Sequence, residues 1–227
     1  MEIEVIPCEM EVEATPIYLP NHGAVKTLLS KDIVDNLWKL IEESKKEPDE
    51  MNTTLAGNIS SSLRLDTRSP LLEGLLQKVL PVLTDTSIQE FGSPLEEDFN
   101  EGQNWSLDEL WVNFQKKHEF NPPHTHSGVY SFVIWMQIPT SFKEQCKLPI
   151  AAKSNAPELI SNFTFNYMDT LGKLVNFTIN MEKDVEGCIV LFPSKLSHQV
   201  FAFYENDDER ISISGNIEMD GHPYRIR

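Results

Sequence analysis

A stretch reading NPPHTHSG places two histidines, His124 and His126, one residue apart. In an extended strand, residues i and i+2 point to the same side, with Cα atoms about 6.5 Å apart. Metal–nitrogen bonds are about 2.0–2.1 Å long, so two such imidazoles can converge on one ion. The neighbouring Pro122, Pro123 and Gly128 predict a strand that ends in a rigid turn. Such a position suits a metal ion that keeps open coordination sites.

A third histidine, His198, follows an apolar strand pattern, GCIVLFP, that ends at Pro193. The sequence Arg210-Ile-Ser212 begins twelve residues after His198. Arginine suits the binding of a carboxylate because its planar guanidinium can donate two parallel hydrogen bonds to it. Ser212 adds a hydroxyl donor on the same side of the strand. We therefore predict a metal site made by the three histidines and a neighbouring carboxylate site at Arg210 and Ser212.

The distance between these two sites follows if the strand after His198 and the strand that begins at Arg210 pair as a hairpin. Pairing Tyr204 with Asp208 leaves a short turn and sets Arg210 opposite Ala202. Ala202 is four residues from His198, which is about 13 Å along a strand. An arginine side chain that reaches back over part of this distance leaves room for a small dicarboxylate. The opposite face of the hairpin is then expected to be apolar, with Phe201, Phe203, Ile211 and Ile213.

The second half of the chain must position these residues, and it reads as a series of short strands rich in β-branched and aromatic residues. The predicted strands are 109–116, 129–138, 161–168, 174–181, 187–192, 198–204 and 210–217, with hairpin turns at 169–173 and 205–209. This pattern is typical of a mainly β fold with flanking helices, a double-stranded β-helix of the small jelly-roll, cupin-like type. A long insertion at 139–158 is a candidate lid or substrate loop.

The first part of the chain, residues 1–104, is expected to support this β-helix core, which spans 105–227, so that 1–227 form one domain. Two amphipathic helices should cover one face of the larger sheet. The expected elements are a short strand at 3–6, a helix at 31–46 capped by Ser30, a strand at 61–66, a helix opened by Ser69-Pro70 that Pro81 kinks or ends, and an acidic loop at 92–104.

The composition limits the possible partners. There are 19 Lys and Arg residues against 35 Asp and Glu residues, a net charge of −16 that repels a phosphate backbone and argues against a nucleic-acid partner. The same charge favours a basic partner through electrostatic steering. Three scattered cysteines, Cys8, Cys146 and Cys188, suggest the reduced thiols of a cytoplasmic protein. The N-terminal residues lack the apolar core of a signal peptide, and no apolar run is long enough to cross a membrane.

The residues singled out above stand in a fixed order: His124-x-His126, Gly187-x5-Pro193, His198 and Arg210-x-Ser212. This pattern resembles the iron(II)/2-oxoglutarate-dependent oxygenases, and in particular a branch often encoded by marine bacteriophages. The segments 120–139 and 191–217 carry the resemblance. If the protein is encoded by a phage, its compartment is the host cytoplasm.

The resemblance implies that iron(II) is held by the three histidines and keeps open positions for other ligands. The cosubstrate 2-oxoglutarate then chelates the iron, and its distal carboxylate contacts Arg210 and Ser212. O2 is the second substrate, and hydroxylation is the usual outcome. Our hypothesis for the group that is hydroxylated is a peptide side chain or a small metabolite. Two residues near the motif are further candidates, since Asn113 could bond the cosubstrate and Tyr130 could line its pocket.

One position departs from the family pattern, which usually has His-x-Asp or His-x-Glu where this chain has His-x-His126. Three neutral imidazoles leave the iron one negative charge short. That difference could shift the redox potential, weaken the retention of iron or favour another metal. It also leaves open that only one of His124 and His126 binds the metal, with a carboxylate from elsewhere completing the site.

Two other functions fit parts of the pattern. Gly187, Pro193 and His198 also resemble the second motif of the cupins, in which a three-histidine metalloenzyme is common, although a glycine before His124 and a glutamate after His126 are missing. A non-enzymatic jelly roll, such as a binding or virion module, is the second alternative, because a fold does not fix a function. A strict requirement for 2-oxoglutarate would distinguish the oxygenase from both.

Overall fold

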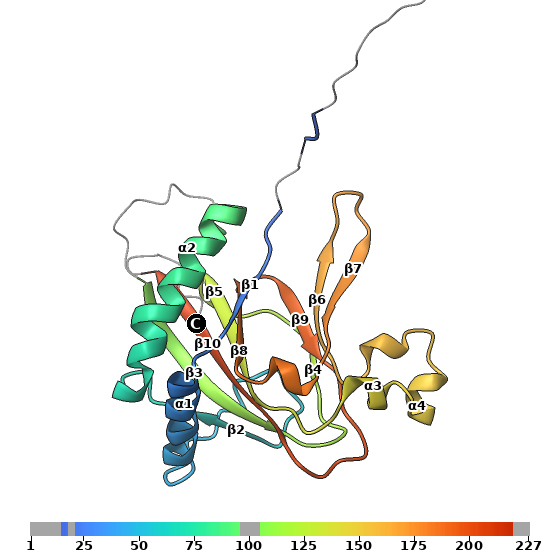
Figure 1. The fold of residues 1–227 in the computed structure, drawn as a ribbon, viewed down its shortest axis with the longest axis horizontal. Coiled ribbons are helices and arrows are strands. Elements are labelled where there is room, and N and C mark those ends of the chain that lie inside the picture. Colours follow the sequence, from blue (N-terminus) through green and yellow to red (C-terminus); the bar gives the residue numbers. More distant parts are fainter. Residues whose placement is uncertain (1–14, 18–20, 96–104, 220–227) are drawn as a thin grey trace, which may run out of the picture.

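Two antiparallel β-sheets face each other in the structure, a computed structural model that describes residues 15–17, 21–95 and 105–219 (Figure 1). The larger sheet has six strands in the order β1-β8-β5-β10-β3-β2, and the smaller has four in the order β4-β9-β6-β7. The larger sheet contains β1 (Val25–Leu28), β2 (Ser61–Arg64), β3 (Trp105–Gln115), β5 (Tyr130–Gln137), β8 (Cys188–Pro193) and β10 (Arg210–Met219). The smaller contains β4 (Asn121–His124), β6 (Phe163–Met168), β7 (Leu174–Ile179) and β9 (Ser197–Val200).

This arrangement confirms the predicted fold class, a mainly β double-stranded β-helix of the jelly-roll type with flanking helices. Each of the seven strands predicted from the second half of the chain has a counterpart. The largest differences lie at Trp105, where β3 begins earlier than expected, and at Val200, where β9 ends earlier. β1 was not predicted, and it pairs with β8 at the edge of the larger sheet.

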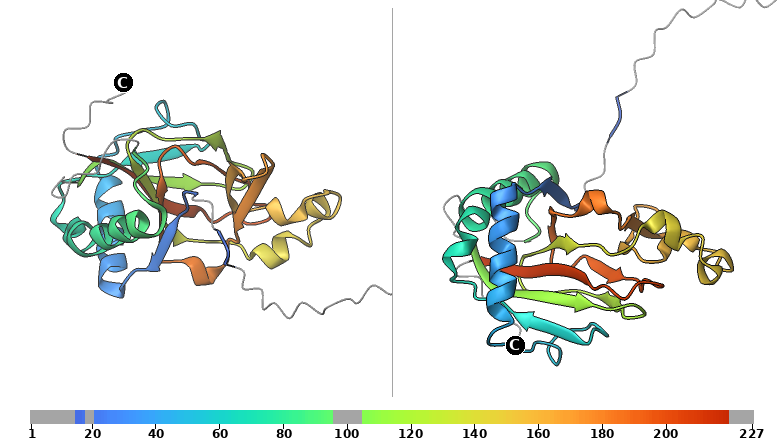
Figure 2. Two further views of the ribbon diagram at one scale, coloured as in Figure 1. Left: turned by 90° about the horizontal axis from the view of Figure 1, so that it is seen from above. Right: turned by 60° about the horizontal axis from the view of Figure 1, so that its bottom comes forward.

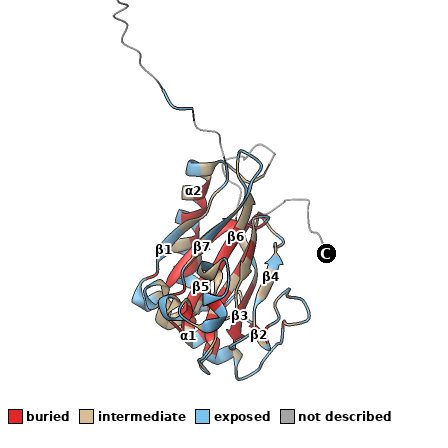
Figure 3. Cartoon of the chain, turned by 90° about the vertical axis from the view of Figure 1, so that its right-hand side faces the viewer, coloured by how far each residue is buried: buried red, intermediate tan, exposed pale blue. Residues whose placement is uncertain are grey.

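The strands of the larger sheet are largely buried (Figure 3). Their side chains alternate between the two faces of the sheet, and this alternation positions the site. On β10, Ile211 and Ile213 belong to the core on the helical side of the sheet, as predicted. Arg210, Ser212 and Ser214 point to the other side, into a pocket between the two sheets. On the neighbouring strand β3 the same alternation puts Leu110, Val112 and Phe114 in the core and Trp111, Asn113 and Gln115 in the pocket.

Two helical segments cover one face of the larger sheet, as predicted (Figure 2). The first is α1 (Lys31–Ser44), with Ser30 at the N-cap position but without a side-chain capping hydrogen bond. Its residues Leu37, Leu40 and Ile41 are buried in the core. The second segment consists of η1 (Pro70–Leu72), the π-helix η2 (Leu75–Val79) and α2 (Leu80–Phe91), and the Ser69 side chain caps its start, accepting from the backbone N–H of Leu71.

Pro81 does not end the second helix, which continues to Phe91. A proline ring collides with the carbonyl four residues before it, and proline has no N–H to donate. The π-helical turn just before Pro81 relieves this conflict, because the N–H of Leu80 donates to the carbonyl of Leu75, one residue further back than in an α-helix. The predicted irregularity is therefore present, whereas the predicted termination is not.

The predicted hairpin between the strands of His198 and Arg210 is wrong. β9 pairs with β4 and β6 in the smaller sheet, whereas β10 pairs with β3 and β5 in the larger one. The segment 201–209 therefore crosses between the sheets. Phe203 does not extend an apolar face beside Ile211 but lies fully buried, with its ring 5.1 Å from the guanidinium of Arg210. A turn-like sequence indicates a change of direction and cannot show which sheet the next strand enters.

The turn predicted at 169–173 is confirmed, since Met168 of β6 pairs with Leu174 of β7 across it. The insertion 139–158 contains α3 (Phe142–Gln145), α4 (Pro149–Ala152) and the start of η3 (Pro157–Leu159), and a further short helix, η4 (Lys183–Val185), precedes β8. No helix among the described residues is long and apolar enough to cross a membrane. The strand predicted at 3–6 and most of the loop 92–104 lie outside the described residues.

Candidate metal centre

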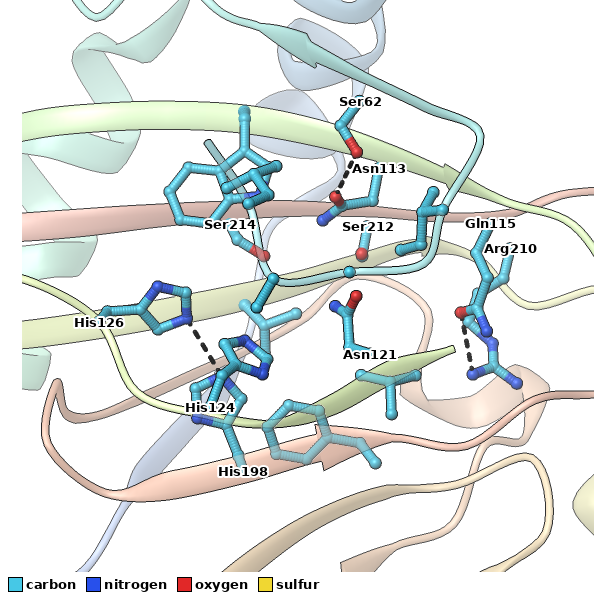
Figure 4. A pocket seen from close by; sticks show the side chains of 18 of the residues that line it. Ser62, Asn113, Gln115, Asn121, His124, His126, His198, Arg210, Ser212 and Ser214 are labelled. Atoms are coloured by element: carbon cyan, nitrogen blue, oxygen red, sulfur yellow. Dashed lines mark hydrogen bonds between the residues drawn. The ribbon is translucent and has the colours of Figure 1, made fainter. Parts of the chain in front are cut away.

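Three histidine side chains meet between the two sheets at one end of the pocket (Figure 4). The ligand atoms of His124, His126 and His198 all lie within 4.8 Å of one another. The Nε2 atoms of His126 and His198 are 3.1 Å apart. Two ligands that bind one ion at about 2.1 Å and at right angles to each other are separated by about 3 Å. The spacing of this pair is therefore that of two ligands of one metal ion.

Two of the histidines are oriented by backbone carbonyls. His124 is the last residue of β4 and lies opposite His198 of β9. The Nδ1 atom of His124 is 2.7 Å from the Pro122 carbonyl oxygen, and that of His198 is 3.0 Å from the Leu196 carbonyl oxygen. An Nδ1–H that donates to a carbonyl leaves Nε2 unprotonated, which is the tautomer that binds a metal.

His126 lies in the turn after β4, and the backbone of this turn is fixed on both sides. The His126 N–H donates to the Ser194 carbonyl oxygen over 2.9 Å, and Lys195 Nζ donates to the His126 carbonyl oxygen over 3.0 Å. Gly128 has a φ of +80°, and a Cβ at this position would lie 2.8 Å from the Ile217 carbonyl oxygen. Only glycine fits this conformation and this close approach, so the glycine of the motif shapes the turn that presents His126.

Burial keeps the three imidazoles uncharged near neutral pH. Desolvation, with smaller contributions from the charges of His124 and Lys195, lowers the pKa of His126 to about 3. Desolvation also lowers the pKa of His124, and it holds the pKa of His198 well below its usual range, together with the charges of the other two histidines. Neutral imidazoles are the form that ligates a transition metal, so the electrostatics suit a cation centre.

The donor set fits an intermediate-softness transition metal such as iron(II), for which imidazole is a common ligand. No carboxylate among the described residues joins the cluster or lines the pocket. The structure therefore offers three imidazoles, with no described aspartate or glutamate to replace His126. The three side chains come from β4, the turn after it and β9, so the ion would be enclosed on the side of the smaller sheet.

A buried arginine lies at the other end of the same pocket, which has a volume of about 170 Å³ (Figure 4). Arg210 is 2% exposed, and none of the ion pairs among the described residues involves it. Its Nη2 donates to the carbonyl oxygen and the hydroxyl of Ser161 over 2.6 and 2.9 Å, and its Nη1 donates to Gln115 Oε1 over 3.4 Å. Its Nε has no partner. Burial lowers the pKa of Arg210 to about 9, so the side chain stays cationic at neutral pH.

Neutral polar side chains connect the two ends of the pocket. Ser212 and Asn113 lie opposite each other on β10 and β3, and the Ser62 hydroxyl donates to Asn113 Oδ1 over 2.9 Å. Ser214 lies one level nearer the histidines, opposite Trp111, whose ring centroid is 5.5 Å from that of His126. The pocket thus combines a cluster of metal-binding type, a polar floor and one buried cation.

Most of the predicted site residues come together here, with one exception. His124, His126, His198, Arg210, Ser212 and Asn113 all line this pocket. Tyr130 does not: it is fully buried in the core on the helical side of β5, with its ring 5.6 Å from that of Trp105. The strand period explains the difference. Tyr130 and Val133 are three residues apart on β5, so their side chains point to opposite faces of the sheet, and Val133 faces the pocket.

Several pocket residues could not be recognised from the sequence. Gln115 faces Arg210 because β3 and β10 pair, and Ser161 reaches Arg210 from the start of β6. Asn121 enters from β4, three residues before His124, and that short spacing was the one local signal available. The loop around Gly57 lines the pocket from a segment far away in the sequence. Apart from Asn121, these residues depend on long-range strand pairing.

The fold and the site define a double-stranded β-helix with a three-histidine centre. Residues 109–216, a little under half of the chain, match the family model described as "Putative 2OG-Fe(II) oxygenase". This segment includes the three histidines, Arg210 and Ser212. The comparison with curated proteins gave no match. The family match, together with the fold, supports the 2OG-Fe(II) oxygenase superfamily, and it implies Fe(II) and 2-oxoglutarate, with which the histidine cluster is consistent.

Solved structures with the same fold are distant in sequence. A prolyl-4-hydroxylase from Pseudomonas putida has a TM-score of 0.52 at 16% identity, over 87% of this chain and 92% of that one. A 2OG-Fe(II) oxygenase family oxidoreductase from Burkholderia pseudomallei has a TM-score of 0.50 at 13% identity, over 86% and 85%. The alpha-ketoglutarate dependent epimerase SnoN from nogalamycin biosynthesis has a TM-score of 0.51 at 14% identity, over 86% and 77%. A hydroxylase and an epimerase share this fold, so the fold alone does not fix the reaction.

Proposed function

We propose that this protein is an iron(II)- and 2-oxoglutarate-dependent oxygenase that hydroxylates a peptide side chain or a small metabolite. The observation that carries the proposal is the shared pocket, with a three-histidine cluster at one end and a buried arginine without an anionic partner at the other. A buried cation without a counter-charge is costly, and a carboxylate ligand would supply that charge. Residues 120–139 and 191–217 also support the proposal for the phage-encoded branch, and the two described cysteines, both free, suit a cytoplasmic enzyme.

In this proposal His124, His126 and His198 hold the metal, and Arg210 and Ser212 bind the distal carboxylate of 2-oxoglutarate. Bound iron(II) supplies the site where O2 and 2-oxoglutarate react, giving succinate and CO2 while a substrate C–H bond becomes C–OH. Arg210 and Ser214 are four residues apart on β10, about 13 Å along the strand. This distance accommodates the arginine side chain together with a five-carbon dicarboxylate, which would extend from the guanidinium to the histidines.

Other pocket residues would bind the cosubstrate and keep water out of the site. Asn113 and Ser212 offer hydrogen bonds along the cosubstrate without adding charge. Trp111, Trp135, Phe163 and Phe192 line the pocket and exclude water from the reacting groups, which strengthens the electrostatic contacts inside it.

The test is the conversion of 2-oxoglutarate to succinate by the iron-loaded protein in air, with His198→Ala as control. We expect succinate to form in the wild type, with O2 consumed in equal amount, and to fall to background in the variant. Metal-dependent turnover of a substrate without 2-oxoglutarate would favour a cupin-type enzyme instead. A protein that neither retains iron nor consumes 2-oxoglutarate would favour a non-enzymatic binding module.

A further inference from the structure

Two polar side-chain atoms in the pocket are buried and have no hydrogen-bond partner, and one of them belongs to a residue with no role so far. They are Nε of Arg210 and Oδ1 of Asn121. Buried polar atoms in folded proteins are nearly always paired, so each exception calls for a reason. For Arg210 the proposed function supplies that reason. A carboxylate ligand has no proton to donate to the Asn121 oxygen, which lies against Gly57. What Asn121 offers a ligand is its amide N–H, which donates to none of the described residues.

Asn121 occupies the middle of the pocket. It projects from β4 of the smaller sheet, between His124 on one side and Arg210 on the other, and faces Ser212 of the larger sheet (Figure 4). Its amide nitrogen is directed toward the histidine end (Figure 4). A ligand that extends from the histidines to Arg210 must therefore pass between Asn121 and the polar floor.

A glycine in a distant loop gives the amide this position. A Cβ on Gly57 would lie 1.9 Å from Asn121 Oδ1, so any larger residue would displace the amide. The φ of Gly57 is not in the left-handed region, so glycine is needed here for space rather than for backbone conformation. The loop is held close to β4, because the Asn58 N–H donates to the Phe120 carbonyl oxygen over 2.8 Å.

The other end of the loop is anchored on the larger sheet. Asn52 Nδ2 donates to the Ile59 carbonyl oxygen over 2.6 Å, and Asn52 Oδ1 accepts from the Ser62 N–H over 2.7 Å. The loop thus connects β2 and β4, the edge strands of the two sheets, and covers the pocket between them. A loop fixed at both ends can hold the amide of Asn121 in one place before a ligand arrives.

We propose that Asn121 is a binding residue for 2-oxoglutarate, whose amide N–H donates a hydrogen bond to a carboxylate oxygen of the cosubstrate, and that Gly57 supplies the room for this amide. The inference rests on the proposed function. An amide suits the position because it donates without adding a charge to a pocket that already contains a buried cation. Hydrogen bonds to a charged ligand are stronger than neutral ones, so the contact should be measurable in affinity.

The test is a calorimetric titration of 2-oxoglutarate into the iron(II)-loaded protein without oxygen. We expect Asn121→Ala to raise the Kd about tenfold, which corresponds to about 1.4 kcal/mol. Asn121→Asp keeps the shape of the side chain but places a negative charge beside a dicarboxylate, so it should raise the Kd further. Gly57→Ala leaves the amide in the chain but displaces it, and it should weaken binding as Asn121→Ala does.

A matched control is Asn166→Ala on β6, since Asn166 also has an unpartnered buried amide atom but does not line the pocket. It should leave the Kd unchanged. Iron content and the thermal midpoint of each variant separate a binding role from a packing role. If Asn121→Asp and Asn121→Ala bind 2-oxoglutarate as tightly as the wild type, this inference is wrong while the proposed function stands. If the wild type itself does not bind 2-oxoglutarate, the proposed function fails, and this inference with it.

Discussion

At the scale of single residues, His126 departs from the His-x-Asp or His-x-Glu pattern of the oxygenase family that this chain resembles. Its Nε2 atom lies 3.1 Å from that of His198, a spacing that two ligands of one ion can have, and no described carboxylate joins the cluster. Three neutral ligands attract a divalent ion less strongly than two neutral ligands and an anion. The charge of the ligand set, rather than its geometry, should therefore limit how tightly the metal is held.

Because an aspartate adds the missing negative charge, we expect His126→Asp to retain iron(II) more tightly than the wild type, by about tenfold in Kd. The measurement is the competition of each protein with a chelator for iron(II) under anaerobic conditions. His126→Ala serves as the comparison, and it should lose most of its iron. If His126→Asp releases iron as readily as His126→Ala, the position requires an imidazole, and the charge argument is wrong.

At the scale of elements, the sequence allowed the faces of the strands to be predicted but not their partners. The two-residue period of a strand places Arg210 and Ser212 on one face and Ile211 and Ile213 on the other, and the structure confirms this. The pairing of β9 with β10 was wrong, yet Arg210 still shares a pocket with His198. The reason is that the two strands face each other across the interior instead of lying side by side.

The same limit explains what could not be predicted around the site. The contacts of Arg210 with Gln115 and Ser161 join residues 95 and 49 positions apart in the chain. No local pattern marks such partners, because they are selected by the register of the sheet and by the crossover at 201–209. Tyr130 was misplaced for a related reason: nearness in sequence to a motif does not reveal which face a strand residue takes.

The packing of the helices against the larger sheet allows the effects of substitutions on stability to be predicted. Leu37 of α1 is fully buried in the core beneath the larger sheet, so Leu37→Ala should destabilise the fold by about 2–5 kcal/mol. Val82 on α2 is 62% exposed, and Val82→Ala should change the stability by no more than about 0.5 kcal/mol. Urea unfolding of both variants checks this, and an equal effect of the two would contradict the assigned packing.

At the scale of the whole molecule, the chain has a net charge of −16, whereas the described lining of the pocket contains no acidic side chain. The acidic surface can steer a basic partner toward the protein, but the pocket offers no counter-charge for a cationic group. We therefore expect the surface to attract a basic partner and the pocket to carry out the reaction. A rate of turnover that falls with ionic strength for a basic substrate, and not for a neutral one, would support the steering.

The buried histidines also link the stability of the metal-free protein to pH. In the unfolded chain each histidine titrates near pH 6.5, whereas in the folded protein burial lowers the pKa of His126 to about 3 and also lowers those of His124 and His198. Below about pH 6.5 the unfolded state therefore binds more protons, and the stability falls as the pH decreases. The loss is at most about 1.4 kcal/mol per pH unit for each histidine.

The check is urea unfolding of the chelator-treated protein at pH 7.5 and pH 5. We expect the wild type to lose much more stability between these values than a variant in which all three histidines are replaced by asparagine. Equal pH dependence of the two proteins would show that the histidines are not buried in the uncharged form.

We propose above all that one pocket holds a metal at the three histidines and 2-oxoglutarate between that metal and Arg210. The most direct test is the visible absorption spectrum of the anaerobic protein with iron(II) and 2-oxoglutarate, for the wild type and for Arg210→Ala. We predict a weak charge-transfer band in the wild type that is lost or needs far more 2-oxoglutarate in the variant, with iron retained in both. The absence of the band in an iron-loaded wild type, or an unchanged band in Arg210→Ala, would contradict the claim.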